Sequence, residues 1–579
     1  MNQVIRYLLS LAMVALVCAC GKDGDGPKDP NEKPDPTAEP TPSVKPDETE
    51  DPNMLYNGII LPGQWPPQRN YRNDIRRGMT PFYLNSKPAY AKIDVGRQLF
   101  VDNFLISTTT LKRVYHYPEY HSSNPVLAPD KDWEQQGKDG GCAAPFSDGV
   151  WYDELEGKFK MWYMAGGGEY STGGSYVTCY AESADGINWT KPALNVVQGT
   201  NIVRMGSVRD ASSVWIDKQE SDATRRYKMF EVSGGAGKWQ YHYLTSSTGL
   251  SWRDNSTPSG HVADRSTVYQ NPFRKVWTWS MRHNVRVNSS DPYTVRARDY
   301  MENSDPVTGN KAAVADLSAF WFGPWSAEQR HPRYSNNDGS PGIYNHDAIA
   351  YESIMLGQFT VWQGPENDIC ERDGVIKRNQ VMLGYSRDGY SWYREDMNPF
   401  MTINDDDRSA WNNGNVQSAV GSPLIVGDKL YFYVSGRKLV NGSEVVSTGL
   451  ATLRRDGFAS MSGTGTLTTE ALKFSGEYLF VNADVRGSLA VEVLDEKGNA
   501  IAGFGKDDCQ PVSSDAAKTM VCWKGGKSLK ALQGQKIRIK FHLSDGDLYS
   551  FWISDTQAGN SHGYTAGGGP GLSPTGIDK

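Results

Sequence analysis

"SDGVWYDELEGKFKMWYMAG" (residues 147–166) and "RDASSVWIDKQESDATRRYKMF" (residues 209–230) follow one pattern. Each has a Val-Trp pair and an Asp two residues later, then a polar turn, then an apolar run that begins with an aromatic residue, Lys and Met. Two such runs around a short polar turn are typical of β-strands joined as a hairpin. The recurrence predicts a chain built from repeated units.

A second recurring phrase marks turns. It reads "YAESADGINW" at 180–189, "LTSSTGLSW" at 244–252 and "GYSRDGYSW" at 384–392, with a shorter copy, "LRRDGF", at 453–458. Trp189 and Trp252 are 63 residues apart, and Trp252 and Trp392 are 140 apart, which is two steps of about 70. A degraded copy, "RDYMENSDP", lies at 298–306. Five units therefore fit between Cys142 and Ser460.

Each unit holds three clear strand signals and a fourth that leads into the next unit. Units of this kind arranged around an axis form the blades of a propeller. The sequence therefore predicts an all-β fold with a five-bladed β-propeller over residues 142–462. The N-terminal segment 54–141 is expected to pack on the propeller, and its strand-like part, 93–107, to complete the last blade and close the ring.

After the propeller the pattern changes. Apolar and polar residues alternate cleanly over 471–504 and 536–554. Alternating strands with frequent turn signals predict a C-terminal β-sandwich, over residues 463–556. The Gly-rich end, 557–579, is interpreted as a loose tail.

Bulk composition limits the partners. The chain has 579 residues and a formal net charge of −7, so two or more domains are expected. The mild acidity and the lack of a basic stripe argue against nucleic acid. The 17 Trp and 30 Tyr suit sheet packing, and they also suit the stacking of flat rings on sugar faces.

The N-terminus has the features of a targeting segment. "MNQVIRYLLSLAMVALVCAC" has one Arg, an apolar run too short to span a bilayer, and small residues before Cys20. Residues 1–20 resemble a bacterial lipoprotein signal, which would leave Cys20 lipidated, with Cys18 as the weaker acceptor and plain secretion as the alternative. Residues 21–53 are rich in Pro and charge and predict a disordered linker. The expected location is the outer membrane or cell surface, with the lipid as the sole membrane contact and the protein as a monomer.

Five cysteines remain after Cys20, and their spacing leaves open a hairpin disulfide between Cys509 and Cys522. There is no Cys-x-x-Cys or His-Glu-x-x-His motif, so a zinc site is not predicted. No cofactor is predicted either, because an axial calcium ion would need a loop of oxygen ligands that the sequence does not contain.

Acidic residues stand near the start of the first strand in four of the five units. In a propeller these strands line the axis, so their ends meet at one mouth. Carboxyl groups that converge there raise one another's pKa, and glycoside hydrolysis needs such a pair, one as proton donor and one as base or nucleophile. The candidates are Asp148, Asp210, Asp264, Asp347 and Glu352, with Asn415 and Gln417 in the fifth unit.

The chain resembles the superfamily of five-bladed β-propeller glycosidases, which includes arabinanases, β-xylosidases, invertases and fructanases. It is more similar to a branch of bacterial lipoproteins in which "GRQLFVDNFLI", "PFSDGVWYD", "NPFRKVWTWSMR", "AYESIMLG" and "VGDKLYFYVSGR" recur. The resemblance covers roughly residues 93–554. It implies two aspartates and one glutamate on inner strands of different blades, and a carbohydrate substrate.

Carried onto this sequence, the resemblance implies Asp148 or Asp210 as base or nucleophile, and Asp210 or Asp264 as the residue that sets the pKa. Glu352 would be the general acid. The chain departs from the invertases, because Asn-Asp-Pro-Asn-Gly is missing and "RDASSV" replaces Arg-Asp-Pro. The resemblance therefore implies the fold more firmly than the activity.

Further polar residues are candidates for binding sugar hydroxyls or a substrate carboxylate. Arginine binds carboxylates in a two-pronged fashion, so an acidic glycan is among the expected ligands, although salt bridges within the protein explain these arginines equally well. The candidate substrate-binding residues are Arg265, Arg282, His283, Arg296, His346, Asp347 and Gln417.

Three hypotheses remain. The leading one is a lipid-anchored glycoside hydrolase, which predicts two carboxyl groups close together in one pocket. The second is a non-catalytic glycan-binding lipoprotein with aromatic platforms at the mouth. The third is a structural or protein-interaction propeller, whose axial acids would be dispersed and paired with arginines.

Overall fold

The computed structural model describes residues 51–579, apart from 136–139, 172–175, 207, 236, 256, 316 and 335–338. The expected signal peptide with Cys20, and nearly all of the expected linker, lie outside the described residues. Residues 51–579 form one compact unit, which is all-β as predicted. Its α-helices are short, and none of them is long and apolar enough to cross a membrane. They are α1 (Tyr71–Asp74), α2 (Phe82–Asn85), α3 (Asp132–Gln135), α4 (Pro306–Ala312) and α5 (Asn367–Asp373).

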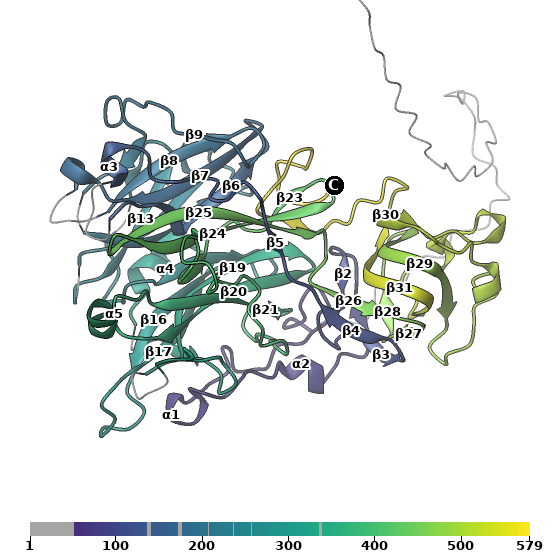
Figure 1. Ribbon diagram of the computed structural model, residues 1–579. Helices are drawn as coiled ribbons and strands as arrows, with labels where there is room; N and C mark the ends of the chain where they lie inside the picture. Colours follow the sequence, from purple (N-terminus) through teal and green to yellow (C-terminus); the bar gives the residue numbers. More distant parts are fainter. Residues whose placement is uncertain are drawn as a thin grey trace, which may run out of the picture. The chain divides into compact units, whose positions relative to one another are not determined.

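Five groups of strands follow one another between residues 143 and 454 (Figure 1). The first group is β6 (Ala143–Asp153), β7 (Lys158–Ala165), β8 (Val177–Ser183), β9 (Trp189–Thr190) and β10 (Ile202–Arg204). The second is β11 (Arg209–Ile216), β12 (Tyr227–Ser233), β13 (Gln240–Ser246) and β14 (Arg253–Asp254). The third is β15 (Thr267–Asn271), β16 (Val276–Val285), β17 (Val295–Asn303) and β18 (Ala319–Phe322). The fourth is β19 (Gly342–Glu352), β20 (Ile354–Gly364) and β21 (Arg378–Ser386), and the fifth is β22 (Asn415–Ser418), β23 (Leu424–Val426), β24 (Lys429–Val440) and β25 (Ser443–Arg454).

Strands within a group pair with an antiparallel neighbour. The fourth and fifth groups are joined into one sheet by a parallel contact between β21 and β22. A strand from the N-terminal segment, β5 (Glu119–Tyr120), pairs with β25 and forms the outer edge of the fifth group. This order of sheets is consistent with a propeller.

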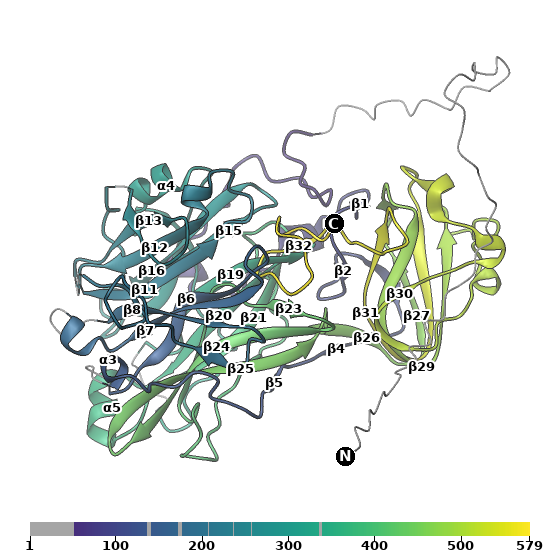
Figure 2. The same ribbon diagram turned by 90° about the horizontal axis from the view of Figure 1, so that it is seen from above.

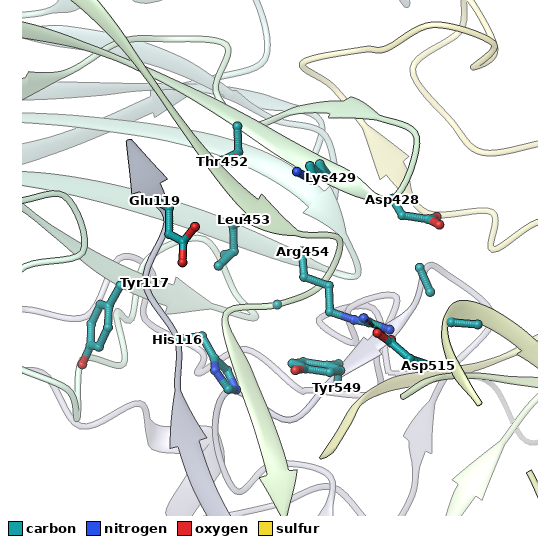
Figure 3. A pocket seen from close by; sticks show the side chains of 13 residues that line it. His116, Tyr117, Glu119, Asp428, Lys429, Thr452, Leu453, Arg454, Asp515 and Tyr549 are labelled. Atoms are coloured by element: carbon teal, nitrogen blue, oxygen red, sulfur yellow. Dashed lines mark hydrogen bonds and ion pairs between the residues drawn. The ribbon is translucent and has the colours of Figure 1, made fainter. Parts of the chain in front are cut away.

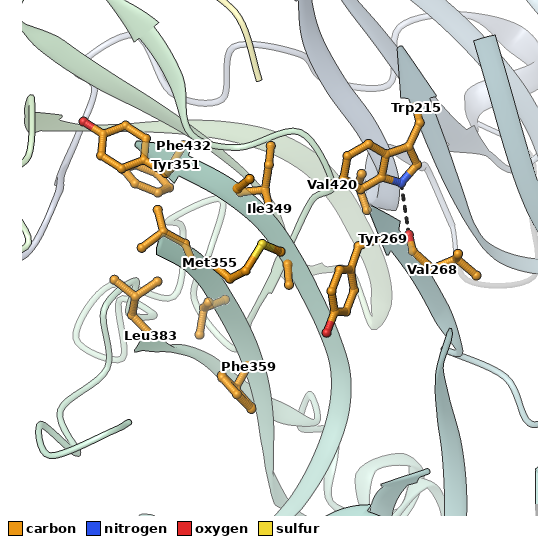
Figure 4. Packing of buried hydrophobic residues seen from close by; sticks show 14 of the residues in the cluster. Trp215, Val268, Tyr269, Ile349, Tyr351, Met355, Phe359, Leu383, Val420 and Phe432 are labelled. Atoms are coloured by element: carbon orange, nitrogen blue, oxygen red, sulfur yellow. Dashed lines mark hydrogen bonds between the residues drawn. The ribbon is translucent and has the colours of Figure 1, made fainter. Parts of the chain in front are cut away.

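The repeated Val-Trp pair explains how neighbouring groups are joined. The indole Nε1–H of Trp151 donates to the backbone carbonyl of Val214 in the second group, at 2.7 Å. The indole of Trp215 makes the same bond to the carbonyl of Val268 in the third group, at 3.0 Å (Figure 4). All these residues are buried, so each bond satisfies a donor and an acceptor that water cannot reach. The repeat is therefore the joint between consecutive groups.

The repeated turns are joined to their neighbours in a similar way. The indole of Trp162 donates to the carbonyl of Gly249, in the turn of the second group, at 2.7 Å. The phenol of Tyr433, in the fifth group, donates to the carbonyl of Gly186, in the turn of the first group, at 2.7 Å. The fifth group thus contacts the first. Trp162 belongs to a large apolar core, part of which is shown in Figure 4, and Tyr433 belongs to a smaller neighbouring core.

The remaining strands form a second assembly with its own core (Figure 2). Eight strands share one sheet: β2 (Gln98–Leu99), β3 (Ile106–Thr109), β4 (Lys112–Tyr115), β26 (Ala459–Ser462), β27 (Gly465–Thr469), β29 (Tyr478–Leu494), β30 (Asp515–Met520) and β31 (Arg538–Ser554). A separate parallel pair joins β1 (Ala91–Lys92) to β28 (Leu472–Lys473). Cys509 and Cys522 are not joined by a disulfide.

The N-terminal segment departs from the expectation that 93–107 completes the last blade. Its strands β2 and β3 pair with β31 and β27 of the second sheet, and Phe100 and Phe104 are buried in the second core. Most of the apolar side chains of this stretch are buried in the second core. The edge of the fifth group is formed instead by a strand of only two residues. That strand is β5, which lies later in the same segment.

The C-terminal stretch 557–579 is ordered in the structure, in contrast to the predicted loose tail. Its strand β32 (Tyr564–Thr565) pairs with the end of β19. The carbonyl of Gly567 accepts from Tyr152 N at 3.0 Å, and that of Gly568 accepts from Ile425 N at 2.8 Å. A Cβ on Gly567 would lie 2.2 Å from the carbonyl oxygen of Gly421. The glycines that suggested a tail are those that let its backbone lie against the strands.

A buried ionic cluster connects the fourth and fifth groups to the second assembly. Arg97 Nη1 donates to Asp456 Oδ2 at 3.0 Å, and Arg455 Nη2 donates to Glu352 Oε1 at 3.0 Å. Asp456 also accepts from Ser550 of β31 at 2.7 Å. Burial alone would raise the pKa of Asp456, but Arg97 and Arg455 outweigh it and lower that pKa to about 2. Asp456 and its neighbours come from "LRRDGF", the shortened fifth copy of the turn phrase.

We expect Gly249→Ala to destabilise the protein more than Gly199→Ala. Both glycines have a positive φ, +76° and +79°, so the backbone strain is matched. A Cβ on Gly249 would lie 2.4 Å from Trp162 Cζ2, whereas nothing lies within 4 Å of a Cβ on Gly199. The extra cost of overpacking at Gly249 is about 1–3 kcal/mol in the free energy of unfolding, measured by urea denaturation. Equal losses would contradict the close indole contact.

Asp456→Asn is expected to lower the free energy of unfolding by about 3–5 kcal/mol at pH 7, because it leaves buried Arg97 with a neutral partner. Asp456 has a folded-state pKa of about 2, below the ordinary 3.8, so its stabilisation is complete above that ordinary value and is lost as the pH falls through about 2. The difference between the two proteins should shrink over that range in denaturation curves. Asp515→Asn, at a side chain 61% exposed, is the control and should change stability by less than about 1 kcal/mol.

Candidate functional site

The first strands of the five groups bring polar residues together at one end. Asp148 of β6 binds Arg209 of β11 through both carboxylate oxygens. Ser147 Oγ donates to Asp347 Oδ2 of β19 at 3.0 Å, and Asn345 Nδ2 donates to Ser418 Oγ of β22 at 2.9 Å. We call this end the axial mouth and define it by Phe146, Asp148, Asp210, Asp264, Arg265 and Tyr344 with the side chains they contact.

Arg265 lies at the centre of the axial mouth. Its guanidinium carbon is 5.0 Å from the ring centroid of Phe146, in the first group, and 5.6 Å from that of Tyr344, in the fourth. Its Nε lies 3.2 Å from Asp210 Oδ1, in the second group. Arg265 has a φ of +58°, a left-handed conformation that is unusual for a residue with a side chain. One side chain from the third group thus contacts three other groups.

Asp148 is fixed in place and has a structural role. Its side chain is fully buried, and its Oδ1 also accepts from Ser212 N at 3.0 Å. Burial raises the pKa of Asp148, and the charge of Arg209 opposes that rise. A carboxylate enclosed by donors in this way orients Arg209, and it has no exposed edge for a substrate.

Asp210 and Asp264 are more accessible. The side chain of Asp210 is 13% exposed, and it accepts from Arg265 N at 3.0 Å. The side chain of Asp264 is 35% exposed and forms an ion pair with Arg282. Burial would raise the pKa of Asp264, but the charges of Arg282, Arg265 and Arg296 outweigh it, so that pKa lies below its ordinary value. Asp264 is therefore ionised at neutral pH.

The structure does not bring Glu352 to the axial mouth. Glu352 is the last residue of β19, five positions after Asp347, which corresponds to roughly 16 Å along an extended strand. Its carboxylate is buried, and it accepts from Ser561 Oγ at 2.6 Å and pairs with Arg455. The sequence suggested that Glu352 lies at the start of an inner strand and therefore at the mouth. In the structure it lies at the opposite end of β19. Its contacts belong to the ionic cluster.

The other predicted binding residues lie near the mouth with partners of their own. Arg296 pairs with Glu366 at 3.1 Å and stacks over Trp362. His283 lies 3.0 Å from Asp299. Gln417 donates to Asn415 Oδ1 at 3.0 Å. Arg282 is the partner of Asp264, as described above.

His346 and Asp347 lie below the mouth in the buried interior. The ring of His346 is surrounded by aromatic side chains, and burial lowers its pKa well below the ordinary value. Asp347 accepts from Ser418 Oγ at 2.6 Å, and burial raises its pKa. Both residues support the floor of the mouth and do not face its opening.

Sequence reasoning missed three residues of the axial mouth. Tyr344 is partly exposed, Phe146 is buried against Arg265 and Arg437, and Lys377 lies with its Nζ 5.8 Å from the ring centroid of Tyr344. Tyr344 stands only three residues before Asp347, so an aromatic residue at the head of β19 was a usable signal. Lys377 precedes the third strand of its group, and nothing in the sequence connects it to the axis.

A separate cavity of about 500 Å³ lies where the fifth group meets the second sheet (Figure 3). Arg454 of β25 stacks over Tyr549 of β31, 4.8 Å from its ring centroid, and His116 lies beside the same ring. None of the predicted site residues lines this cavity. Among the described residues, no group of three or more His, Cys, Asp or Glu side chains could hold a metal ion.

No protein-family model and no curated protein matches the chain. Solved structures do match. A candidate glycoside hydrolase from Bacteroides ovatus has 13% identity and a TM-score of 0.35, with 58% of this chain and 96% of that one covered. An N-acetylgalactosamine deacetylase from F. plautii, in complex with blood group B trisaccharide, has 10% identity and a TM-score of 0.36, with 57% and 97% covered.

A fructofuranosidase from Schwanniomyces occidentalis, complexed with fructosylnystose, has 8% identity and a TM-score of 0.36, with 76% of this chain and 98% of that one covered. Other matching structures are described as glycoside hydrolases. At these identities and TM-scores they assign no activity or residue role to this chain. The function is therefore argued from the axial mouth itself.

We expect Asp148→Asn to destabilise the protein far more than Asp264→Asn. The first change leaves buried Arg209 without its carboxylate partner and should cost about 3–5 kcal/mol in the free energy of unfolding. The second affects a pair whose carboxylate is 35% exposed and should cost about 1 kcal/mol or less. Urea denaturation of both variants measures the difference. Similar losses in the free energy of unfolding would show that the buried pair of Asp148 stabilises the fold no more than the exposed pair of Asp264.

Proposed function

We propose that the chain is a glycoside hydrolase whose substrate binds at the axial mouth. In this proposal the five strand groups are the blades of a five-bladed β-propeller, and the second assembly is a β-sandwich. Cys20 carries a lipid that anchors the protein to the outer membrane or cell surface. The protein acts as a monomer on a carbohydrate.

One observation carries the proposal. Asp148, Asp210 and Asp264 come from three successive strand groups and meet at one mouth, where Asp148 is enclosed and the other two keep exposed edges. Cleavage of a glycosidic bond uses two carboxyl groups in one site, and Asp210 and Asp264 both lie beside Arg265. A purely structural role predicts acids that are dispersed and paired with arginines; these acids are paired with arginines, but they lie at one mouth.

The two accessible aspartates take different roles. Asp264 stays ionised because Arg282, Arg265 and Arg296 lower its pKa, so it acts as base or nucleophile. Asp210 protonates the leaving oxygen, and the backbone N–H of Arg265 orients it. Asp148 acts through Arg209 as a positioning residue. Glu352 is replaced by Asp210 in the role that the resemblance implied.

The alternative is a glycan-binding protein without catalysis. It is favoured by the ion pairs, since Asp148, Asp210 and Asp264 each have an arginine partner. An arginine beside a carboxyl group opposes its protonation, which a general acid needs. Tyr344 would then serve as the aromatic platform.

Sugar release from a panel of plant and host polysaccharides tests the proposal. We expect Asp210→Asn and Asp264→Asn each to reduce release about 10²–10⁴-fold, with the fold retained by circular dichroism. Asp222→Asn, at an exposed residue that caps a short turn, should leave release unchanged. Retarded migration in a glycan-containing gel with no release from any polymer would support the binding alternative instead. Release that survives both variants would remove Asp210 and Asp264 from the catalytic step.

A further inference from the structure

Most of the cations at the axial mouth are paired with a carboxylate. Five arginines are each paired with one carboxylate, and these pairs cancel: Arg209–Asp148, Arg265–Asp210, Arg282–Asp264, Arg296–Glu366 and Arg437–Glu444. Two cations at the mouth remain, Arg298 and Lys377. Arg298 is buried and donates to backbone carbonyls, while Lys377 has no ion pair with a described residue.

Two further carboxyl groups lie near these cations. Asp299 lies 3.0 Å from His283, and Asp347 is buried, where its Oδ2 accepts from Ser147 and Ser418 and burial raises its pKa. Burial lowers the pKa of Arg298 to about 9, so its guanidinium still carries charge at neutral pH. Lys377 is thus a cation at the mouth without a paired carboxylate among the described residues, although the whole chain has a formal charge of −7.

Arg265 has bonding capacity that the protein leaves unused. The residue is only 5% exposed, and its Nη1 is buried without a hydrogen-bond partner among the described residues. An unsatisfied buried guanidinium N–H is costly, and a bound anion would remove that cost. Arginine presents two parallel N–H groups to a carboxylate or a sulfate, so the geometry suits a planar or tetrahedral anion.

The pKa of Tyr344 shows the effect of the positive charges around it. Burial alone would raise the pKa of its phenol, but the charges of Lys377, Arg265 and Arg437 outweigh it and hold the pKa below the ordinary 10.0. A negative charge at the phenolic oxygen is therefore stabilised. A ligand anion that lies between Lys377 and Arg265 would be stabilised by the same charges.

We propose that the axial mouth binds a negatively charged sugar unit, a uronic acid or a sulfated sugar, through Arg265 and Lys377 beside Tyr344. The inference rests on the proposed function and names its substrate class. Arg282 and Arg296, the arginines that suggested an acidic ligand from sequence, already hold Asp264 and Glu366. The ligand's anion is received by Arg265 and Lys377 instead.

Binding of this kind also changes the pair between Arg265 and Asp210. A substrate anion on Arg265 takes over part of the positive charge that now faces Asp210, and it adds a negative charge nearby. An anionic substrate therefore weakens the ion pair between Arg265 and Asp210, and a neutral sugar leaves it intact.

The test is the binding of matched polymers at low salt, measured by affinity gel electrophoresis and calorimetry. Polygalacturonate carries carboxylates only, carrageenan carries sulfates only, and carboxyl-reduced polygalacturonate and arabinan are neutral. We expect one of the two anionic polymers to bind at least about tenfold more tightly than the neutral ones, and to weaken as salt is added. Which of the two binds separates a carboxylate site from a sulfate site. Equal binding of polygalacturonate and its reduced form, with no binding of carrageenan, would overturn the inference.

Variants assign the binding to the proposed cations. Lys377→Gln should weaken binding of the anionic polymer about tenfold, and Lys377→Arg should restore it, because the charge is kept. Arg265→Gln should weaken binding further, with the fold checked by circular dichroism. Lys530→Gln, at a side chain 73% exposed in the second assembly, is the control and should have no effect. Unchanged binding in Lys377→Gln would refute the site even if an anionic polymer binds.

The outcome for this inference is separate from that for hydrolysis. Release of sugar from a neutral polymer, with no preference for anions, would keep the hydrolase and reject the anionic substrate. Lys377-dependent binding of an anionic polymer, with no release from any polymer, would keep the anion site and reject the hydrolase.

Discussion

The joint between strand groups is a buried hydrogen bond from an aromatic side chain to a backbone carbonyl of a neighbouring group. Trp151 and Trp215 make this bond through their indoles, and Tyr433 makes it through its phenol from the fifth group to the first. A buried carbonyl left without a donor is costly, so each group depends on its neighbour to complete its polar contacts. This dependence fixes the angular register of the groups, and that register places Asp148, Asp210 and Asp264 at one mouth.

These contacts between groups also explain why the repeated strand groups could be predicted from the sequence. Trp151 and Trp215 must recur because each contacts an equivalent carbonyl, and the glycines of the turns must recur because Gly249 lies against Trp162 and Gly186 against Tyr433. The sequence repeats because the repeated residues make equivalent contacts in successive groups. The assignment of 93–107 failed for the opposite reason, since that stretch has no repeated partner. The strand-like pattern of 93–107 predicts that this stretch pairs with a sheet, but it does not determine which of the two sheets it joins.

The sequence predicted site residues only where the first strands of the units could be aligned with one another. Asp148, Asp210 and Asp264 were found because each stands at the head of a first strand, whereas Lys377 comes from the head of a third strand and reaches the axis only in three dimensions. Glu352 was misplaced because an eleven-residue strand carries its two ends to opposite faces. The shortened turn copy, "LRRDGF", does form a turn, but the carboxylate of Asp456 lies in the buried cluster that holds Glu352.

Charge at the mouth explains how ion pairs and catalysis can be reconciled. In the proposed hydrolase, the side chain of Asp210 is held by an ion pair with Arg265. Arg265 is, however, incompletely bonded, and it lies in a field that already stabilises negative charge at Tyr344. A substrate anion can therefore compete for Arg265 at little electrostatic cost. In the proposed hydrolase, a substrate anion on Arg265 would loosen the ion pair that holds Asp210, so the charge of the substrate would change the contacts of this carboxyl group.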